Sequence, residues 1–150
     1  MATFVFVQPA WMGGWCWNKV AAQLRELGHE VYAPTLTGLA ERAHLASPDV
    51  GLTTHIEDVV SVVVFDDLRD IVLVGTSSGG TVITGVANRI TDRIASLVYL
   101  DAFLPSAGQC TLDLLCRRAT WSARDARRNG GRRLARAPLR AASLASHLAW

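Results

Sequence analysis

The chain has 150 residues, half of them hydrophobic, and a formal net charge of +2. This is enough apolar material for the core of one ordinary domain. No apolar run approaches the roughly 20 residues that a membrane-spanning helix needs, and no basic segment precedes the first apolar run as in a secretory signal. Three cysteines without CxxC spacing indicate reduced thiols, not a disulfide framework or a zinc site. We therefore expect a soluble, cytoplasmic protein.

The small net charge hides a break in composition near residue 116. Residues 1–116 carry six Lys or Arg against twelve Asp or Glu, whereas residues 117–150 carry nine Arg against one acid. Such a break is typical of a boundary or of a basic arm that binds nucleic acid. We therefore expect residues 1–115 to form the folded part and residues 116–150 to be a separate Arg/Ala-rich tail.

The chain begins with strand and helix patterns in alternation. β-branched and aromatic residues over 3–8 predict a strand. Apolar residues recur at helical spacing over 15–27 and are followed by Gly28, a residue typical of helix C-termini. A second strand is predicted over 30–34, because its composition again favours an extended chain.

The next segment is predicted to be a long loop followed by a helix. Residues 35–51 are rich in turn formers and have no sustained period. Thr53 or Thr54 can then cap a helix that runs to about Phe65. Glu57, three residues after Thr54, completes the pattern of a capping box.

The clearest strand follows over residues 70–75, a continuous apolar run of the kind buried on both faces of a parallel sheet. A helix to about residue 87 or 90 and an apolar strand over 94–100, ending at Asp101, come next. Strands that alternate with helices indicate the α/β class, with a parallel sheet and right-handed crossovers.

Between the 70–75 strand and its helix lies the sequence Gly-Thr-Ser-Ser-Gly, residues 75–79, which fits G-x-S-x-G. This pattern is informative only in a strand–turn–helix context, which is the context predicted here. Gly75 and Gly79 would let the strand and the helix approach closely while Ser77 projects from a strained turn. Ser77 is therefore the candidate nucleophile. The N–H of Ser78, near the helix N-terminus, is a candidate oxyanion-hole donor.

Other interpretations of this turn are weaker. Ser78 is a rival nucleophile, but it lacks a glycine two residues before it. A nucleotide-binding P-loop requires Gly-Lys-Ser/Thr, which does not follow. The alternative that remains is a glycine- and serine-rich turn without chemistry.

Several motifs occur together in one known order. Trp-Met-Gly-Gly-Trp-Cys-Trp at 11–17, Pro-Thr-Leu-Thr-Gly-Leu-Ala-Glu-Arg at 34–42, Ala-His-Leu at 43–45 and Gly-Thr-Ser-Ser-Gly-Gly at 75–80 resemble the esterase and hydroxynitrile-lyase branch of the α/β-hydrolases, which includes the methyl salicylate esterases. The likeness covers about residues 3–115. It implies a partial α/β-hydrolase fold and a serine esterase that hydrolyses a small carboxylic ester through a Ser-His-Asp triad and an acyl-enzyme, with no metal or cofactor.

The sequence departs from the family pattern near the expected oxyanion hole. Gln8 and Pro9 replace the usual His-Gly after the first strand, although Ala10 matches the residue whose N–H is the family's second donor. Thr76 and Ser78 replace the usual histidine and aromatic residue beside the nucleophile, which widens the expected site. The resemblance therefore implies an oxyanion hole of Ala10 and Ser78 and leaves the preferred acyl group open.

The partners that would activate Ser77 are not evident. In α/β-hydrolases the acid and the histidine follow the nucleophile, and here the one histidine after Ser77 is His147, in the tail. Asp101 is the best acid candidate because it ends a strand at the carboxyl edge of the sheet, although a structural hydrogen bond or a helix cap explains it as well. The earlier histidines, His29, His44 and His55, are expected to be structural or solvated.

The tail and the missing partners leave several alternatives. The abrupt loss of resemblance at residue 116 suggests a frame-shifted reading, and a basic nucleic-acid-binding arm is the alternative. A chain with part of the fold could also be a non-catalytic remnant. The resemblance implies that a hydroxynitrile lyase would need a lysine beside its histidine, and this activity is disfavoured because the single lysine, Lys19, lies in the first predicted helix. Loss of the last strands would leave an apolar sheet edge, so self-association is expected.

Overall fold

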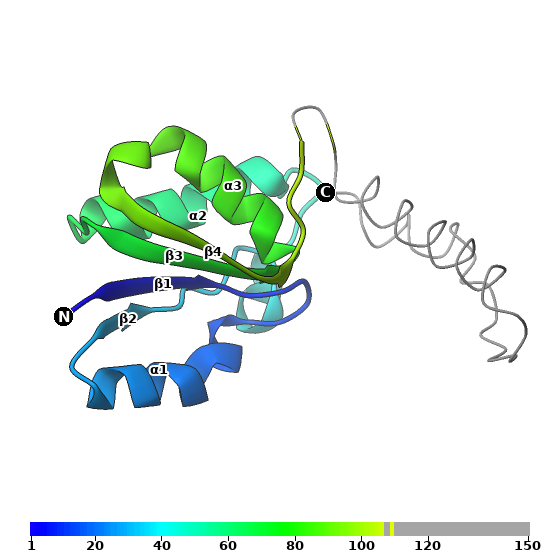
Figure 1. Ribbon diagram of the computed structural model, residues 1–150. Coiled ribbons are helices and arrows are strands. Elements are labelled where there is room, and N and C mark those ends of the chain that lie inside the picture. The colour runs from blue at the N-terminus through cyan, green and yellow to red at the C-terminus, as the bar shows by residue number, and fades with distance from the viewer. Residues whose placement is uncertain (107–108, 110–150) are drawn as a thin grey trace, which may run out of the picture.

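The computed structural model of the protein describes residues 1–106 and residue 109. Its centre is a sheet of four parallel strands in the order β2-β1-β3-β4 (Figure 1). The strands are β1 (Thr3–Val7), β2 (Glu30–Tyr32), β3 (Ile71–Ser77) and β4 (Ile94–Ala102). The helices are α1 (Asn18–Glu26), α2 (Leu52–Phe65) and α3 (Gly79–Arg89). The predicted α/β class is confirmed, whereas the tail predicted over 116–150 lies outside the described residues.

Helices lie on both faces of the sheet, with α1 on one side and α2 and α3 on the other (Figure 1). Side chains alternate along a strand, so neighbouring residues of β3 enter different layers. Leu73 packs in a cluster with Val59 of α2 and Ile83 of α3. Val74 points to the opposite face and packs in a second cluster with Ala21 of α1. The continuous apolar run therefore marks a central strand, as predicted.

Several element boundaries differ from the predictions. The strand predicted over 30–34 ends at Tyr32, and the loop predicted over 35–51 contains the 3-10 helix Ala40–Leu45. The helix expected over 15–27 is a short 3-10 helix, Gly14–Trp17, followed by α1. Strand β4 continues to Ala102, so Asp101 lies within the strand and not after it. After α1, Gly28 adopts a φ of 82° and the His29 N–H donates to the Leu24 carbonyl at 3.0 Å, as expected for a glycine-terminated helix.

The predicted cap of α2, Thr53 or Thr54, is wrong by two or three residues. Gly51 is the N-cap, and Thr54 acts from the third helical position by accepting the Gly51 N–H at 3.3 Å. Glu57 does not complete a capping box but forms an ion pair with Arg89 of α3. A pattern confined to one helix could not predict this pair, because it depends on how α2 and α3 pack. In the described ranges, no helix is long and apolar enough to cross a membrane.

Candidate active site

Ser77 is the last residue of β3 and has a φ of 51°, in the left-handed region that is unfavourable for residues other than glycine. Two hydrogen bonds to the end of β4 hold this turn. The Thr76 hydroxyl donates to the Leu100 carbonyl at 2.8 Å, and the Phe103 N–H donates to the Ser77 carbonyl at 2.9 Å. The structure thus contains the strained strand–turn–helix arrangement that the sequence motif requires.

The glycines around Ser77 permit close contacts that any side chain would prevent. A Cβ atom on Gly75 would lie 2.7 Å from the Gly79 carbonyl oxygen, and one on Gly79 would lie 2.7 Å from the Val7 carbonyl oxygen. Gly80, which the motif does not include, is tighter still, since its Cβ would lie 2.2 Å from the Phe103 carbonyl oxygen. The sequence feature that indicates this contact is the second glycine of the Gly79-Gly80 pair. Together the glycines let α3 start directly against the ends of β1, β3 and β4.

This packing brings together the two segments that carry the candidate oxyanion donors. Ser78 is the N-cap of α3, so its amide lies at the positive end of the helix. A Cβ on the next residue, Gly79, would also lie 2.9 Å from the Gln8 carbonyl oxygen, two residues before Ala10. The N-terminus of α3 and the loop after β1 are therefore neighbours.

Gln8, which occupies the position of the family histidine, has a structural role that the sequence did not reveal. Its side chain is almost fully buried, with 1% of its surface exposed. In the amide orientation that satisfies both neighbours, its nitrogen donates to the Pro34 carbonyl at 3.0 Å and its oxygen accepts the Leu36 N–H at 2.9 Å. Gln8 thus joins the loop that carries Ala10 to the loop after β2.

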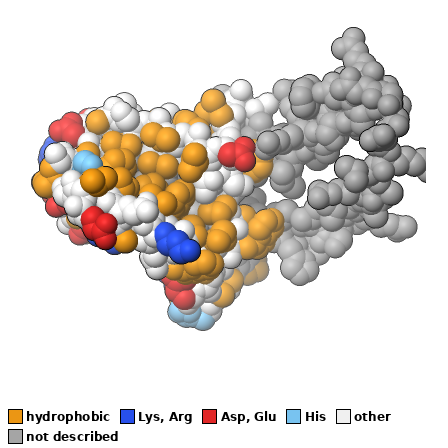
Figure 2. All heavy atoms as spheres, turned by 60° about the horizontal axis from the view of Figure 1, so that its bottom comes forward, with side chains coloured by type: hydrophobic (Ala, Val, Ile, Leu, Met, Phe, Trp, Pro, Cys, Tyr) orange, Lys and Arg blue, Asp and Glu red, His pale blue; other side chains and the backbone are white. Residues whose placement is uncertain are grey.

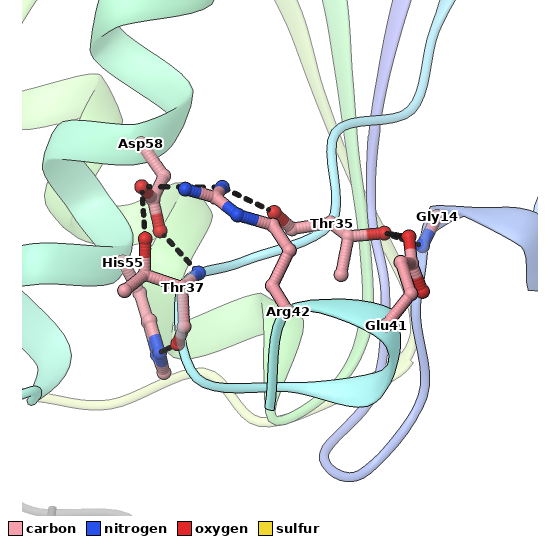
Figure 3. Close-up of polar contacts among 7 residues, drawn as sticks. All are labelled: Gly14, Thr35, Thr37, Glu41, Arg42, His55 and Asp58. Carbon is pink, nitrogen blue, oxygen red and sulfur yellow. Dashed lines mark hydrogen bonds and ion pairs between the residues drawn. The ribbon is translucent and has the colours of Figure 1, made fainter. Parts of the chain in front are cut away.

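A second connection joins the same two loops through Thr35 (Figure 3). The Thr35 hydroxyl accepts the Gly14 N–H at 2.8 Å and donates to the Glu41 carboxylate. This hydrogen bond is the main reason why the pKa of Glu41 lies below its usual value. Arg42 donates to the Thr35 carbonyl at 2.8 Å. The loop with Ala10 is therefore attached at both ends, through Gln8 and through Gly14.

Asp58 of α2 anchors the loop after β2 to the helix layer (Figure 3). Its carboxylate accepts the Thr37 N–H at 2.7 Å and the Thr37 hydroxyl at 2.8 Å. It also lies 3.7 Å from the Arg42 guanidinium. We define Thr35, Thr37, Glu41, Arg42 and Asp58 as the loop anchor. The sequence did not predict the loop anchor, because four of its members lie in a loop without a periodic pattern and the fifth, Asp58, reaches them from α2.

Asp101 lies at the end of β4, next to the nucleophile turn. The strand register pairs its neighbour Ala102 with Ser77, and Asp101 itself has a φ of 44°. Its side chain is exposed. The structure therefore brings the candidate acid to the correct edge of the sheet. In the described part of the chain, no three His, Cys, Asp or Glu side chains are grouped so that they could hold a metal ion.

Of the three described histidines, His29 and His55 make structural contacts and His44 is exposed. His29 accepts the Ala2 N–H at 3.1 Å and packs edge-on against Phe4. His44 lies in the 3-10 helix Ala40–Leu45 of the loop after β2. The buried His55 contacts the Thr37 carbonyl at 2.9 Å (Figure 3). The remaining histidine, His147, lies outside the described residues.

Burial of His55 makes the stability of the fold depend on pH. Burial is the main reason why the pKa of His55 lies below its usual value, although the Thr37 carbonyl and Asp58 oppose the shift. Below about pH 6.5 the unfolded chain therefore binds more protons than the folded one, and stability falls as the pH decreases. We expect the melting temperature to fall less between about pH 7.5 and 5.5 in His55→Gln than in the wild type. Equal slopes in thermal melts monitored by circular dichroism would contradict this assignment.

The fold and the turn at Ser77 agree with comparisons to known proteins. The model of the Alpha/beta hydrolase family matches residues 4–150. A carbendazim hydrolyzing esterase of Nocardioides sp. is 54% identical over 115 residues, which are 77% of this chain and 48% of that protein. The probable esterase PIR7A of Oryza sativa subsp. indica is 38% identical over 109 residues, 71% of this chain and 41% of the rice protein.

Comparison with solved structures indicates the same family as the sequence relatives do. An extracellular α/β-hydrolase from a Paenibacillus species, described as a structural and functional homologue of tobacco salicylic acid binding protein 2, superposes with a TM-score of 0.71 at 33% identity. The match covers 86% of this chain and 53% of that one. A methylesterase from Arabidopsis gives a TM-score of 0.65 at 30% identity over 73% of this chain and 47% of its own. The chain spans about half the length of these relatives, and it belongs to the α/β-hydrolase family.

Proposed function

We propose that the chain carries the nucleophile half of a serine-dependent carboxylic ester hydrolase, with Ser77 as the nucleophile. The observation that carries the proposal is the left-handed φ of 51° at Ser77. This strained residue stands between Gly75 and Gly79, whose close backbone contacts leave no room for side chains. Strain of this kind clusters at functional sites, where a side chain must project from a tight turn.

In the proposed reaction, Ser77 Oγ attacks the ester carbonyl carbon and loses its proton to a base. The N–H groups of Ala10 and Ser78 stabilise the negative charge on the carbonyl oxygen. The alkoxide leaves with a proton, an acyl-enzyme forms, and water then releases the carboxylic acid and regenerates Ser77. Asp101 is the candidate acid for orienting a base, since it lies beside the turn.

The similarity to esterases supports a small ester as the substrate class. The bacterial relative is named for hydrolysis of carbendazim, and the plant relatives are named as esterases or methylesterases. Thr76 and Ser78 leave more space beside Ser77 than larger neighbours would.

Cys16 is a thiol, which fits the proposed cytoplasmic location, and burial is the main reason why its pKa lies above the usual value.

Hydrolysis of p-nitrophenyl acetate by the full chain tests the role of Ser77. Ser77→Ala should remove all hydrolysis above that of buffer, because no acyl-enzyme can form. Ser78→Ala is the matched control: it removes the neighbouring hydroxyl but keeps the backbone N–H, so it should retain most of the wild-type rate. Mass spectrometry of peptides after brief reaction should find the acetyl group on Ser77. Equal rates in the wild type and Ser77→Ala would remove Ser77 from the mechanism.

A non-catalytic remnant is the second candidate, and the positions of the histidines favour it. His29, His44 and His55 all precede Ser77, and His29 and His55 already make structural contacts. A folded wild-type chain that hydrolyses the ester no faster than Ser77→Ala, and that gains no acetyl group, would establish this second function.

A further inference from the structure

The loop after β1 begins with a strained turn. The Met12 N–H donates to the Pro9 carbonyl at 3.4 Å, which makes Ala10 and Trp11 the central residues of the turn. Trp11 has a φ of 65°, whereas the φ of Ala10 is not positive, and this combination is typical of a type II turn. Such a turn favours glycine at the position of Trp11, and a bulky residue there is an outlier.

Packing of the Trp11 side chain does not explain the strain, because that side chain is 65% exposed. Strain of this kind persists only where the surrounding structure fixes the backbone. The residues on either side of the turn supply this constraint. Gln8 precedes the turn and is almost fully buried, and the Gly14 N–H after it donates to the Thr35 hydroxyl at 2.8 Å (Figure 3).

Both attachments reach the same three consecutive residues, 34–36. The Gln8 side-chain amide donates to the Pro34 carbonyl and accepts the Leu36 N–H, and Thr35 between them holds Gly14. Breaking either bond of Gln8 would leave a buried polar group without a partner, which is unfavourable. The Gln8 amide therefore fixes the place at which the turn begins.

The turn leaves one backbone N–H without a protein partner. In the described part of the chain, the Ala10 N–H donates to no other group. A Cβ on Gly79 would lie 2.9 Å from the Gln8 carbonyl oxygen, so the start of the turn lies against the N-terminus of α3. Ala10 thus has the unpaired donor that an oxyanion hole requires, and the place of this donor depends on the turn.

We propose that Gln8 is a positioning residue of the oxyanion hole. Its side-chain amide fixes the strained turn, and the turn holds the Ala10 N–H near the N-terminus of α3. The inference rests on the proposed function for the use of that N–H, but the position of the N–H can be measured without any reaction. Without the two hydrogen bonds of Gln8, the left-handed Trp11 would relax and carry the neighbouring Ala10 amide with it.

Amide NMR spectra of the full chain test the positioning directly. Gln8→Leu has a side chain of similar size but makes neither hydrogen bond. Relative to the amides of β3, the Leu36 amide should exchange with solvent at least tenfold faster in this variant, because its acceptor is lost. The Ala10 signal should shift and broaden as the turn relaxes.

Val63→Ala is the matched control, because Val63 is fully buried in α2 and its truncation destabilises the fold without altering the turn. The relative exchange of Leu36 and the signal of Ala10 should stay unchanged in this control. Figure 2 shows a face of the molecule on which hydrophobic side chains gather over a broad area, and such surfaces favour association. All variants are therefore compared at one low protein concentration.

Hydrolysis of p-nitrophenyl acetate tests the consequence for the reaction. Gln8→Leu should lower kcat about tenfold to a hundredfold, because a displaced donor stabilises the transition state less well. Its KM should change little, since the oxyanion exists only after the substrate has bound. Val63→Ala should keep both constants near the wild-type values.

Gln8→Glu adds a rescue that depends on pH. A neutral carboxyl group can donate to the Pro34 carbonyl and accept the Leu36 N–H, whereas a carboxylate has no proton to donate. Burial raises the pKa of such a carboxyl group above its usual value of about 4.3. Below the raised pKa, the Ala10 signal and the ratio of the variant's kcat to that of the wild type should approach the wild-type values. Both should approach those of Gln8→Leu as the pH rises through it.

The outcomes separate this inference from the proposed function. A folded wild type that does not hydrolyse the ester would contradict the proposed function, while the Leu36 and Ala10 signals would still decide the role of Gln8. Unchanged signals in Gln8→Leu would overturn the inference, and so would an active Gln8→Leu protein with the kcat of an active wild type. If Gln8→Leu does not fold, the signals of Gln8→Glu at low and high pH decide, and their independence of pH would overturn the inference.

Discussion

Replacing Asp58 by alanine should lower the free energy of unfolding by about 2–4 kcal/mol. The side chain is only 14% exposed and accepts two hydrogen bonds from Thr37, at 2.7 and 2.8 Å. Hydrogen bonds to a charged group contribute about 1.5–3 kcal/mol each, and deleting the acceptor leaves two partly buried donors without this partner. Arg42 would also lose its neighbouring carboxylate. Urea unfolding monitored by tryptophan fluorescence measures the change.

Glu57→Ala is the matched control for this experiment, since Glu57 precedes Asp58 on α2. Its ion pair with Arg89 joins two helices, as the ion pair of Asp58 joins a helix to a loop. The side chains of Glu57 and Arg89, however, are both 40% or more exposed. Exposed pairs contribute about 0–1 kcal/mol because water and salt screen them. If the two variants lost equal stability, the loop anchor would not have the structural importance assigned to it.

Gly79→Ala should destabilise the fold even though alanine is the better helix former. The new Cβ would lie 2.7 Å from the Val7 carbonyl oxygen and 2.9 Å from that of Gln8, and neither backbone atom can rotate away. Forcing extra atoms into a packed site costs about 1–3 kcal/mol. Gly79 is the first residue of α3, where the gain in helix propensity is smaller than the roughly 1 kcal/mol of a helix interior, so the steric cost dominates. The shift would also separate the amides of Ala10 and Ser78, so ester hydrolysis should fall more than stability.

Gly85→Ala provides the comparison within the same helix. Gly85 lies inside the helix, where alanine gains about 1 kcal/mol in helix propensity, and the nearest atom to its Cβ is the terminal Cδ1 of Ile56, at 2.2 Å. That methyl group can move with its side chain, so the loss of stability should be smaller than in Gly79→Ala. Thermal melts and p-nitrophenyl acetate assays of both variants decide the matter. A Gly79→Ala protein as stable and active as Gly85→Ala would show that α3 does not need this contact.

The strand β3 and the turn after it could be predicted from the sequence for a clear physical reason. A buried parallel strand is apolar on both faces, so residues 71–74 can be identified as a strand from their own sequence, without knowledge of the strands they pair with. The spacing of Gly75 and Gly79 around Ser77 then indicates two positions where a side chain would not fit. In the structure, both glycines make close backbone contacts. Both signals are complete within about ten residues.

The surroundings of that turn could not be predicted, because they depend on contacts between distant segments. Gln8 reaches Pro34 and Leu36, and Thr35 accepts the N–H of Gly14. None of these residues belongs to a periodic pattern. The cap of α2 was misplaced for a related reason, since several residues near position 53 can cap a helix and the loop determines which one does.

The members of the candidate triad also differ in how well the sequence predicts them. Ser77 is part of a local motif, whereas its base and acid would come from segments that only the complete fold brings near it. Asp101 could be proposed because strand ends meet at one edge of a parallel sheet, and the structure places it there. A base could not be assigned, because the one histidine after Ser77, His147, lies in the tail and outside the described residues.

The left-handed conformation of Ser77 also bears on why the residue is still a serine. A side chain in this conformation costs about 1–2 kcal/mol, which glycine would avoid. Stability alone would favour glycine at this position, so a serine here fits its proposed role as the nucleophile. This cost is confined to a single residue, and substitutions that stabilise the sheet elsewhere could be made without changing it.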